Sequence, residues 1–344
     1  MKWYERPEAD CDIIISSRVR LARNLLAHPF PSRINLEEAK AAIGSIKRSI
    51  MGDEQTPSYL AHTLTFEELS AVPDDRLKEM TERHVLSKVM LENKEKRAFL
   101  HSPDESMSVM VNEEDHVRIQ SIFCGQDLEA AYKAAARLDD YMAESLDYAF
   151  DTDFGYLTSC PTNTGTGMRA SYMLHLPILE QTGNLKFFAD VITKAGFTIR
   201  GTYGEGSEAV GSIYQISNQL TLGRSEEMTL SSLKSLAHQI SEKERGFRQR
   251  AVKEYPREAE DIIYRAYGIL SHARKISLKE GMKHLSDIRC GIQLGLIGHV
   301  VKNGSVFKLM TDIQPASLQK IAGRSRDDRH LDALRADYIR SCFI

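Results

Sequence analysis

Apolar residues recur along this chain with two different spacings, and the change between them divides it into regions. Two early segments carry the capping box that begins a helix, a polar residue followed three positions later by a carboxylate: Asn35 with Glu38, and Thr65 with Glu68. From about residue 97, apolar and polar residues alternate, which is the period of a half-buried strand. The segments with this strand-like pattern are 107–112, 116–123, 169–177, 196–202 and 211–217.

Helical spacing interrupts these strands and later replaces them. An apolar stripe runs through 128–149, on Leu128, Tyr132, Ala135, Leu138, Met142, Leu146 and Ala149. A short helix is expected at 184–195, and a long charged helix at 226–254, whose basic stretch 243–250 looks like a solvated face. Everything beyond Pro256 looks helical, with a capping box from Ser277 to Glu280. We therefore expect one domain at 1–255 and a helical domain at 256–344 that packs on the first domain or on a second copy.

Composition adds limits to this outline. With 344 residues, 42% hydrophobic and 27% charged, the chain suits a soluble globular enzyme of one large and one smaller domain. A net charge of −3 gives no electrostatic footprint for nucleic acid or a membrane surface, and no apolar run is long enough for a membrane span. The five cysteines are widely spaced without a CxxC pair, which argues against disulfides and structural zinc and favours a cytoplasmic protein.

Five arginines fall on the polar faces of four expected strands. Alternate side chains of a strand share a face. In the segment 15–21, which we also expect to be a strand, Arg18 and Arg20 therefore lie opposite the apolar Val19 and Leu21. The other three are Arg118, Arg169 and Arg200. Taken singly, each arginine most simply solvates an exposed sheet face. If the strands are neighbours, the like charges repel by about 4 kcal/mol per pair at about 4 Å, and the cluster predicts a polyanionic ligand such as a nucleoside triphosphate.

The common phosphate-binding motifs do not account for such a site. No GxxxxGK[ST] segment exists, which excludes a P-loop. Asp153-Phe154-Gly155 spells the DFG of eukaryotic-type protein kinases, but the HRDxxxxN and APE segments that accompany it are missing, so we treat it as a coincidence. The glycine pairs in Gly165-Thr166-Gly167 and Gly204-Glu205-Gly206 indicate by themselves only tight turns.

Four segments together resemble the catalytic domain of the guanidino (phosphagen) kinases in order and spacing. They are Ser16-Ser17-Arg18-Val19-Arg20-Leu21-Ala22-Arg23-Asn24, Val111-Asn112-Glu113-Glu114-Asp115-His116-Val117-Arg118, Cys160 to Ser171, and Arg200-Gly201-Thr202-Tyr203-Gly204-Glu205. The resemblance covers about residues 11–250, and within the superfamily the chain is similar to the bacterial protein-arginine kinases. Its motifs begin almost at once, without the N-terminal helical domain of phosphagen kinases, which suits a site open to a protein substrate.

The resemblance implies an α+β fold, a twisted and mainly antiparallel sheet flanked by helices, followed by the all-helical C-terminal domain. It implies ATP with Mg²⁺ as the phosphoryl donor, with no metal held by protein ligands alone. Glu114 and Glu205 would face the guanidinium of the substrate, with Cys160 close to it. The residues that the resemblance places at the nucleotide are Ser17, Arg18, Val19, Arg20, Leu21, His84, Arg118, Arg169, Ala170, Ser171, Tyr172, Met173, Arg200, Gly201, Thr202, Tyr203, Gly204 and Glu205.

The chemistry of arginine limits how such a site can work. Removing a proton from a guanidinium of pKa about 13.8 at pH 7 costs about 9 kcal/mol, so the proton leaves only as the N–P bond forms. Glu114 and Glu205 would orient and polarise the planar group before accepting that proton. The arginines, with Mg²⁺ that arrives on ATP, would stabilise charge on the transferring group. Cationic surroundings favour the Cys160 thiolate, which we expect to act electrostatically without forming phosphocysteine.

The helical domain ends with a second resemblance. Leu331-Asp332-Ala333-Leu334-Arg335-Ala336 is similar to the R-D-x-x-R-A segment with which the family binds phosphoarginine allosterically. Leu331 stands in place of its first arginine, which removes one charge-assisted contact and leaves Asp332, Arg335 and Ala336 as candidates. The small size of the helical domain favours a homodimer, and the family implies a small activator protein and a stress-response role in marking proteins for a Clp unfoldase-protease.

Two other functions stay open on the sequence. A kinase for a free guanidino metabolite is disfavoured by the missing N-terminal domain. A catalytically silent phosphoarginine-binding adaptor is disfavoured because both glutamates, Cys160 and all the arginines are retained. We predict a protein-arginine kinase that transfers the γ-phosphoryl group of ATP to arginine side chains of other proteins, without direct contact to nucleic acid or membrane.

Overall fold

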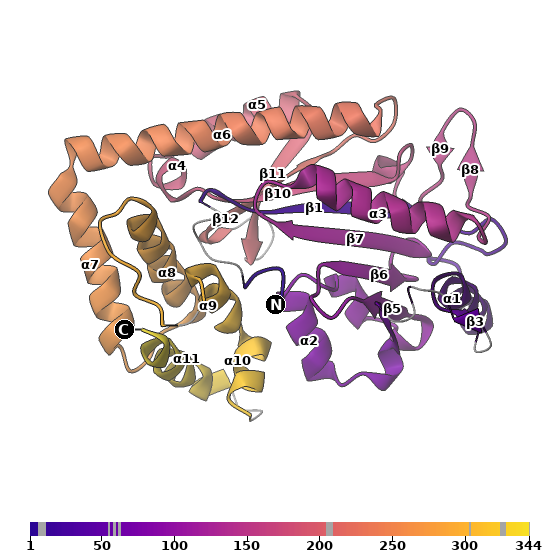
Figure 1. Ribbon diagram of the computed structural model, residues 1–344, viewed down its shortest axis with the longest axis horizontal. Helices are drawn as coiled ribbons and strands as arrows, with labels where there is room; N and C mark the ends of the chain where they lie inside the picture. The colour runs from indigo at the N-terminus through magenta and orange to yellow at the C-terminus, as the bar shows by residue number, and fades with distance from the viewer. Residues whose placement is uncertain are drawn as a thin grey trace.

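An antiparallel sheet of eight strands forms the centre of the molecule (Figure 1). The computed structural model describes residues 1–5, 12–53, 56–57, 60, 63–203, 209–302, 304–323 and 328–343, and the strand order of the sheet is β11-β12-β10-β1-β7-β6-β5-β4. The strands are β1 (Ile14–Arg23), β4 (Thr65–Glu68), β5 (Ala98–His101), β6 (Met107–Val111), β7 (Val117–Cys124), β10 (Met168–His175), β11 (Phe197–Tyr203) and β12 (Ala209–Asn218). Two short hairpins add β2 (Gly52–Asp53) with β3 (Thr56–Pro57), and β8 (Phe150–Asp151) with β9 (Gly155–Tyr156).

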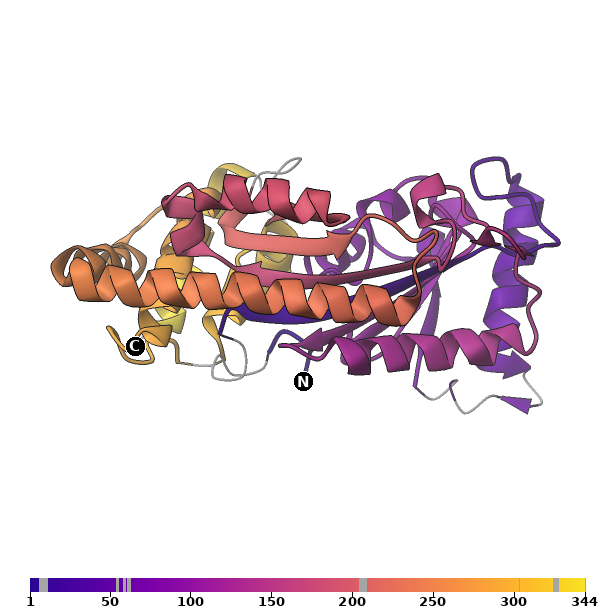
Figure 2. The ribbon, with the colours of Figure 1, turned by 90° about the horizontal axis from the view of Figure 1, so that it is seen from above.

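Helices cover one face of this sheet, as the view from above shows (Figure 2). They are α1 (Leu36–Met51), α3 (Leu128–Ala143), α4 (Pro177–Gln181), α5 (Asn184–Lys194) and α6 (Glu226–Glu254). The strands meet them with alternate apolar residues such as Val19, Leu21, Ile119 and Tyr172, all of which are buried in the main core. Burial of one side of each strand therefore fixes which residues must point to the opposite face.

Two smaller cores lie on that opposite face, at separate places. One packs α2 (Asp74–Glu82) against Phe99 of β5 and Met110 of β6. The other packs the C-terminal helices against Ile122 of β7 and Met173 of β10. Those helices are α7 (Pro256–His272), α8 (Leu278–Gln293), α9 (Val306–Asp312), α10 (Pro315–Ile321) and α11 (Asp328–Cys342). The polar part of the opposite face belongs to neither of these cores.

The fold class expected from the resemblance is confirmed. The strands at 107–112 and 116–123 and the helices at 184–195 and 226–254 are present within one or two residues of the predicted ends. The capping box at Asn35 is also present, since its side chain accepts a hydrogen bond from the backbone N–H of Glu38. In the described part of the chain, short 3-10 helices connect elements: η3 (Leu69–Ala71), η4 (Lys88–Leu91), η5 (Lys94–Lys96) and η6 (Pro161–Asn163). Among the described residues, none of the helices combines the length and the apolar character that crossing a membrane requires.

The helix expected to begin at Thr65 is wrong, because Thr65–Glu68 is strand β4. Thr65 pairs with His101 and Glu68 with Ala98, so this segment extends the sheet at its edge. Backbone pairing with β5 therefore outweighs the local capping pattern. The apolar stripe at 128–149 also includes more than a helix: α3 ends at Ala143, and the buried Leu146 and Ala149 follow it in irregular chain.

Candidate active site

Strand register places the predicted arginines of three adjacent strands on one face. Arg20 of β1 lies directly opposite Arg169 of β10, and directly paired residues of an antiparallel sheet share a face. On the other side of β1, Arg118 of β7 pairs with Ala22. Ala22 shares the face of Arg20 and Arg18, because residues two apart on a strand point the same way. These four arginines, which the sequence could not place together, are therefore neighbours.

The fifth arginine reaches the same face through β12. Arg200 of β11 pairs with Gln215 of β12, and Gln215 pairs with Met173 of β10. Met173 lies four residues after Arg169 and so shares its face. We call this surface, with Arg18, Arg20, Arg118, Arg169 and Arg200, the arginine face.

The arginine face is electrostatically unfavourable in the absence of an anion. Burial lowers the pKa of Arg20 well below its usual value, and the charges of Arg18 and Arg118 lower it further. Burial also lowers the pKa of Arg169, followed by the charges of Arg200 and Arg118. Arginine stays protonated in proteins, so these directions report the free-energy cost of gathering the charges. Several phosphate oxygens brought onto this face would offset that cost.

Polar side chains of β12 hold two of the guanidinium groups. Ser217 Oγ accepts hydrogen bonds from Nη2 and Nε of Arg169, at 3.1 and 3.3 Å. Gln215 Oε1 accepts a hydrogen bond from Nη2 of Arg18. Neither residue was assigned a role from the sequence, although alternation along β12 puts both on the arginine face and was the signal available.

Two adjacent glutamates in the turn between β6 and β7 have different surroundings. Glu113 is buried, and its carboxylate is paired with Nη1 of Arg118. The Glu114 side chain is 46% exposed, and its Oε2 lies 3.5 Å from Nη2 of Arg118. The carboxylate of Glu114 is therefore accessible to a substrate. The buried carboxylate of Glu113 instead neutralises the charge of Arg118. The role of Glu113 was not predicted.

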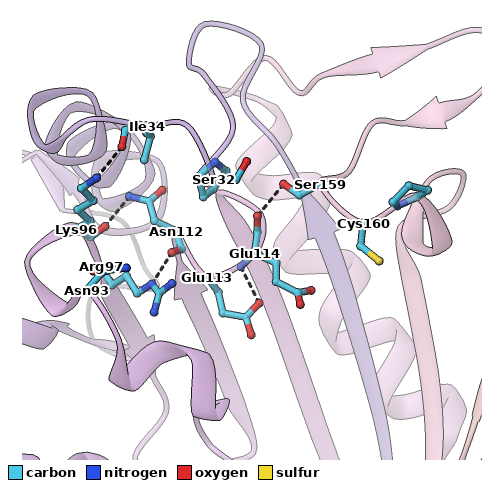
Figure 3. A pocket seen from close by; sticks show the side chains of 12 residues that line it. Ser32, Ile34, Asn93, Lys96, Arg97, Asn112, Glu113, Glu114, Ser159 and Cys160 are labelled. Carbon is cyan, nitrogen blue, oxygen red and sulfur yellow. Dashed lines mark hydrogen bonds between the residues drawn. The ribbon is translucent and has the colours of Figure 1, made fainter.

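Glu114 and Cys160 line the same cavity, which has a volume of about 530 Å³ (Figure 3). Its other walls include Ser32 and Ile34 on one side and Asn93 and Lys96 on another. Lys96 Nζ donates a hydrogen bond to the Ile34 carbonyl at 2.8 Å, which joins these two walls. This volume is ordinary for a ligand-binding pocket. We call this cavity the Glu114–Cys160 cavity.

The cysteine segment is tied to the glutamate turn by Ser159. Its backbone N–H donates to Asp115 Oδ1 and its hydroxyl to the Glu114 carbonyl, both at 2.7 Å. Asp115 is buried, and the same Oδ1 accepts a 2.7 Å hydrogen bond from Asn24 Nδ2. Cys160 Sγ lies 3.1 Å from Thr162 Oγ1. These contacts fix the relative position of the carboxylate and the thiol before any substrate binds.

Glu114 and Cys160 are electrostatically connected with the arginine face. Both raise the pKa of Arg169, against the larger lowering by burial and by the neighbouring arginines. The cysteine and the exposed glutamate thus lie at the edge of the cationic surface. A group held in the Glu114–Cys160 cavity would meet an anion held on the arginine face at this boundary.

His84 is placed beneath two of the arginines. Burial lowers the pKa of its imidazole to about 3, and the charges of Arg18 and Arg20 act in the same direction. Its backbone carbonyl accepts a 2.7 Å hydrogen bond from Gln120 Nε2, and Gln120 pairs with Arg20 across β1 and β7. The imidazole is therefore neutral near pH 7 and belongs to the floor of the arginine face.

Several predicted nucleotide residues do not reach this face with their side chains. Direct pairing with Tyr172 puts Ser17 on the opposite face, where it is buried. The side chains on that opposite face are those of Ser17, Val19, Leu21, Ala170 and Tyr172. A nucleotide could meet these five only through their backbone. Gly201 pairs with Tyr214 and also lies away from Arg200.

The remaining predicted residues divide into three groups. Ser171, Met173 and Thr202 share the arginine face, although Met173 is buried in the core with the C-terminal helices. The backbone of Tyr203 ends β11 beside Ala209. Gly204 and Glu205 lie outside the described residues, so the second predicted carboxylate is not placed.

The C-terminal candidates lie in α11, away from the arginine face. Arg335 is buried, and it donates to the carbonyls of Ile313 and Ile276 at 3.1 and 3.0 Å and to Asp332 at 2.7 Å. Ala336 is buried in the core of the helical domain. In the part of the chain that the structure describes, no group of three or more His, Cys, Asp or Glu side chains is arranged to hold a metal ion.

Two family models match consecutive parts of the chain. Residues 48–247 match "ATP:guanido phosphotransferase, C-terminal catalytic domain", and residues 256–344 match "Protein-arginine kinase McsB C-terminal domain". A protein-arginine kinase of Clostridium kluyveri is 44% identical over 95% of this chain and 94% of its own length. One of Caldanaerobacter subterraneus subsp. tengcongensis is 42% identical over 96% of each chain.

Solved structures support the same fold. A crystal structure of lombricine kinase matches with a TM-score of 0.60 and 23% identity, over 74% of this chain and 70% of that chain. The duplicated taurocyamine kinase from Schistosoma mansoni, with bound transition state analog components, matches with a TM-score of 0.61 and 25% identity, over 75% of this chain and 37% of that chain.

Proposed function

The chain belongs to the protein-arginine kinases of the ATP:guanido phosphotransferase family, and from that premise we propose that it transfers the γ-phosphoryl group of ATP to arginine side chains of other proteins. One observation carries the proposal: the arginine face and the Glu114–Cys160 cavity adjoin. A triphosphate on the former and a guanidinium in the latter would meet where their charges are complementary.

ATP is the proposed donor because its phosphates suit the arginine face. Arg20 and Arg169, opposite each other at its centre, would bind the oxygens of the transferring group and of the leaving ADP. Mg²⁺ prefers oxygen ligands and usually keeps several waters. With Glu113 already paired to Arg118, phosphate oxygens and water are the ligands that fit it. When bound, the ion would neutralise part of the phosphate charge.

The proposed acceptor chemistry rests on Glu114, Cys160 and the unplaced Glu205. Glu114 would accept parallel N–H bonds from the guanidinium and hold it in line with the phosphoryl group. As the N–P bond forms, the guanidinium loses a proton to a carboxylate, because its own pKa of about 13.8 forbids earlier loss. Cys160 would add negative potential beside the cationic substrate.

A protein substrate is supported by the relatives' names and by the shape of the cavity. Its two walls, at Ser32–Ile34 and Asn93–Lys96, extend beyond Glu114 and Cys160. They would contact the residues that flank the target arginine. A single guanidino metabolite would leave these walls unused.

The wider context is proposed from family membership. We propose that the enzyme acts in the cytoplasm during stress, together with a small activator protein, and marks proteins for a Clp unfoldase-protease. Cys124, Cys160, Cys290 and Cys342, the described cysteines, are all free thiols, which suits a reducing compartment.

Regulation and assembly are proposed for the helical domain. Its exposed Ile262 and Tyr264, together with the preceding Tyr255, form an apolar surface that a homodimer would cover. Phosphoarginine binding at Asp332, Arg335 and Ala336 remains a proposal. It requires Arg335 to exchange at least one backbone carbonyl for phosphate.

The test is incubation of the enzyme with ATP, Mg²⁺ and an unfolded protein such as casein. Acid-labile phosphate on arginine, located by mass spectrometry under neutral conditions, is the expected result. Phosphate on serine would contradict the proposed chemistry. Phosphate on free arginine alone, with none on protein, would contradict the proposed substrate.

A further inference from the structure

One half-buried carboxylate at the end of α2, that of Glu82, joins the catalytic domain to the helical domain. Glu82 Oε1 accepts a hydrogen bond from the backbone N–H of Ala316, and Oε2 accepts one from that of Ser317, both at 2.8 Å. The Ser317 hydroxyl donates to Oε2 as well, at 2.9 Å. Ala316 and Ser317 are in the first turn of α10, which lies beside α2 (Figure 1). One side chain thus satisfies two backbone donors that this helix cannot satisfy itself.

Arg83, the residue after Glu82, is held in place by ion pairs. Arg83 lies between two carboxylates, 2.8 Å from Glu79 and 3.0 Å from Glu105. Glu79 also pairs with the exposed Lys320 of α10, at 2.9 Å. The end of α2 is therefore held on one side by the helical domain and on the other by its own domain.

His84 follows directly, in a strained backbone conformation. Its φ of 62° is in the left-handed region, which is unfavourable for a residue with a side chain and persists only where the surroundings impose it. On one side, Gln120 binds the His84 carbonyl. On the other, Trp3 lies between His84 and Phe307 of α9, with ring centroids 6.4 and 6.0 Å away. The turn is thus held between the sheet and the helical domain.

The strained turn supports the arginine face directly. His84 and Trp3 line a small space together with Arg18 and Gln215, two residues of that face. A shift of the His84 ring would therefore change the packing that holds the Arg18 side chain in position.

We infer that Glu82 is a positioning residue for the phosphoryl donor: by binding the first turn of α10, it holds the His84 turn under Arg18 and Arg20, so that the helical domain completes the nucleotide half of the site. The inference rests on the proposed nucleotide role of the arginine face. It gives the helical domain a part in ATP binding that involves neither a second copy nor an added ligand.

The experiment measures nucleotide affinity of the full-length enzyme, with a fluorescent ATP analogue, alongside KM and kcat on casein. Glu82→Ala is expected to raise the dissociation constant and the KM for ATP about tenfold, while kcat at saturating ATP changes less than about twofold. Glu82→Gln keeps one acceptor oxygen and should recover about half of the loss on a logarithmic scale. Ser317→Ala removes one of three hydrogen bonds and should weaken ATP binding less than about threefold.

Two controls separate positioning from general damage. Lys283→Ala removes an exposed ion pair within α8 of the helical domain, 2.9 Å from Asp287, and should leave nucleotide affinity unchanged. Ile339→Val removes a methylene from the buried core of the helical domain, so it should lower the unfolding temperature without changing nucleotide affinity. A Glu82→Ala enzyme that is less stable but binds ATP normally would overturn the inference. So would equal losses of affinity in Glu82→Ala and Ile339→Val at matched loss of stability.

An Arg20→Ala enzyme distinguishes failure of the proposed nucleotide site from failure of the inference about Glu82. If Arg20→Ala binds the analogue as the wild type does, the nucleotide assignment of the arginine face fails, and the inference about Glu82 fails with it. If Arg20→Ala loses binding while Glu82→Ala does not, only the inference about Glu82 is overturned.

Discussion

At the scale of single residues, the difference between Glu113 and Glu114 defines what each can do. Glu113 is buried against Arg118, while Glu114 faces the cavity beside Cys160. We predict that Glu114→Gln lowers kcat for arginine phosphorylation about 10²–10⁴-fold, because the amide can still orient a guanidinium but cannot take its proton. Affinity for ATP should stay within about twofold. Steady-state kinetics with casein, and a separate binding titration, measure the two effects.

Glu129→Gln on the exposed surface of α3 removes the same charge far from the cavity and should leave kcat unchanged. Glu205→Ala should resemble the Glu114 variant, with transfer abolished and ATP still bound. A fully active Glu205→Ala enzyme would contradict the role given to that residue. A Glu114→Gln enzyme of wild-type kcat would do the same for Glu114.

A second residue-scale prediction concerns His116 and pH. His116 Nδ1 accepts a 3.1 Å hydrogen bond from the Leu25 N–H, and Nε2 lies 3.1 Å from the Pro29 carbonyl, an arrangement that needs a neutral ring. Burial, with a smaller contribution from the nearby His28, lowers the pKa of His116 to about 4. The folded protein therefore binds this proton less readily than the unfolded chain, whose histidines titrate near pH 6.5.

Because the unfolded state takes up the proton first, stability falls as pH drops from about 6.5 to about 4, by about 3 kcal/mol for this residue. Denaturant unfolding at several pH values measures it. His116→Gln should flatten this part of the pH dependence, even though the variant is less stable at pH 7. His238→Gln, on the exposed side of α6, should leave the slope as it is. Equal slopes for wild type and His116→Gln would refute the assignment.

At the scale of elements, the position of the cysteine segment depends on Asp115. Asp115 binds Ser159 and Asn24, so it joins the turn after β6, the end of β1 and the segment before η6. We predict that Asp115→Ala lowers kcat about 10²-fold, because small displacements of reacting groups have effects of this size. Nucleotide affinity should be kept. Asp151→Ala, which removes a carboxylate from the β8–β9 hairpin, is the control. An equal loss of kcat in that variant would show that Asp115 has no specific role in placing the cysteine segment.

The walls of the Glu114–Cys160 cavity predict selectivity for protein substrates. Ser32→Tyr should fill part of the space beyond Glu114 and lower kcat/KM for casein at least about tenfold, since a blocked subsite costs binding energy. Phosphorylation of a short arginine peptide should fall less, and ATP affinity should not change. Ser231→Tyr on exposed α6 is the control. Equal losses for the protein and the short peptide would mean that the walls do not contact flanking residues.

Elements were predictable where a local pattern and the tertiary structure agree. The ends of α6 follow from Ser225 and Pro256, and the alternation in β6 and β7 is complete within the segments themselves. The helix predicted at Thr65 was wrong because the pairing partner of Thr65–Glu68, β5, lies thirty or more positions later in the chain, where no local signal reaches. The face of each arginine was predictable from period two alone, but the adjacency of β1, β7 and β10 was not.

At the scale of the whole molecule, the missed features are contacts between distant segments. The contact of Glu82 with α10 has no sequence signature, because nothing local marks a side chain for a partner in another element. Alternation along β12 indicates the face of Ser217 but not its contact with Arg169. The stretch 243–250 shows the same limit. The sequence predicts a solvated helix face for this stretch, yet Glu244 and Arg248 are buried where α6 meets the helical domain.

Arg248 joins parts of both domains. It donates to Glu244 at 2.7 Å, to Gln293 of α8 at 2.6 Å and to the His175 carbonyl at 3.1 Å. We predict that Arg248→Ala lowers the free energy of unfolding by about 3–5 kcal/mol, because it leaves the carboxylate of Glu244 buried and unpaired. Calorimetry should show one transition, shifted to lower temperature, since both domains depend on this contact.

Arg250→Ala, two residues further along α6, is a matched control. Arg250 is exposed and lies 3.7 Å from Glu254, so its removal should change stability by less than about 1 kcal/mol. Two separate transitions in Arg248→Ala, with only one of them shifted, would show that the domains unfold independently.

The direct pairing of Arg20 with Arg169 also restricts how the gene for this enzyme can change. One codon inserted within β1 between Val19 and Arg20 would reverse the faces of the residues after it, turning Arg20 towards the core and Leu21 onto the arginine face. Inside β1, β7 and β10, only insertions or deletions of an even number of residues keep the charged and the core side chains on their own faces. The function of the site therefore depends on which alternate positions of these strands carry the arginines.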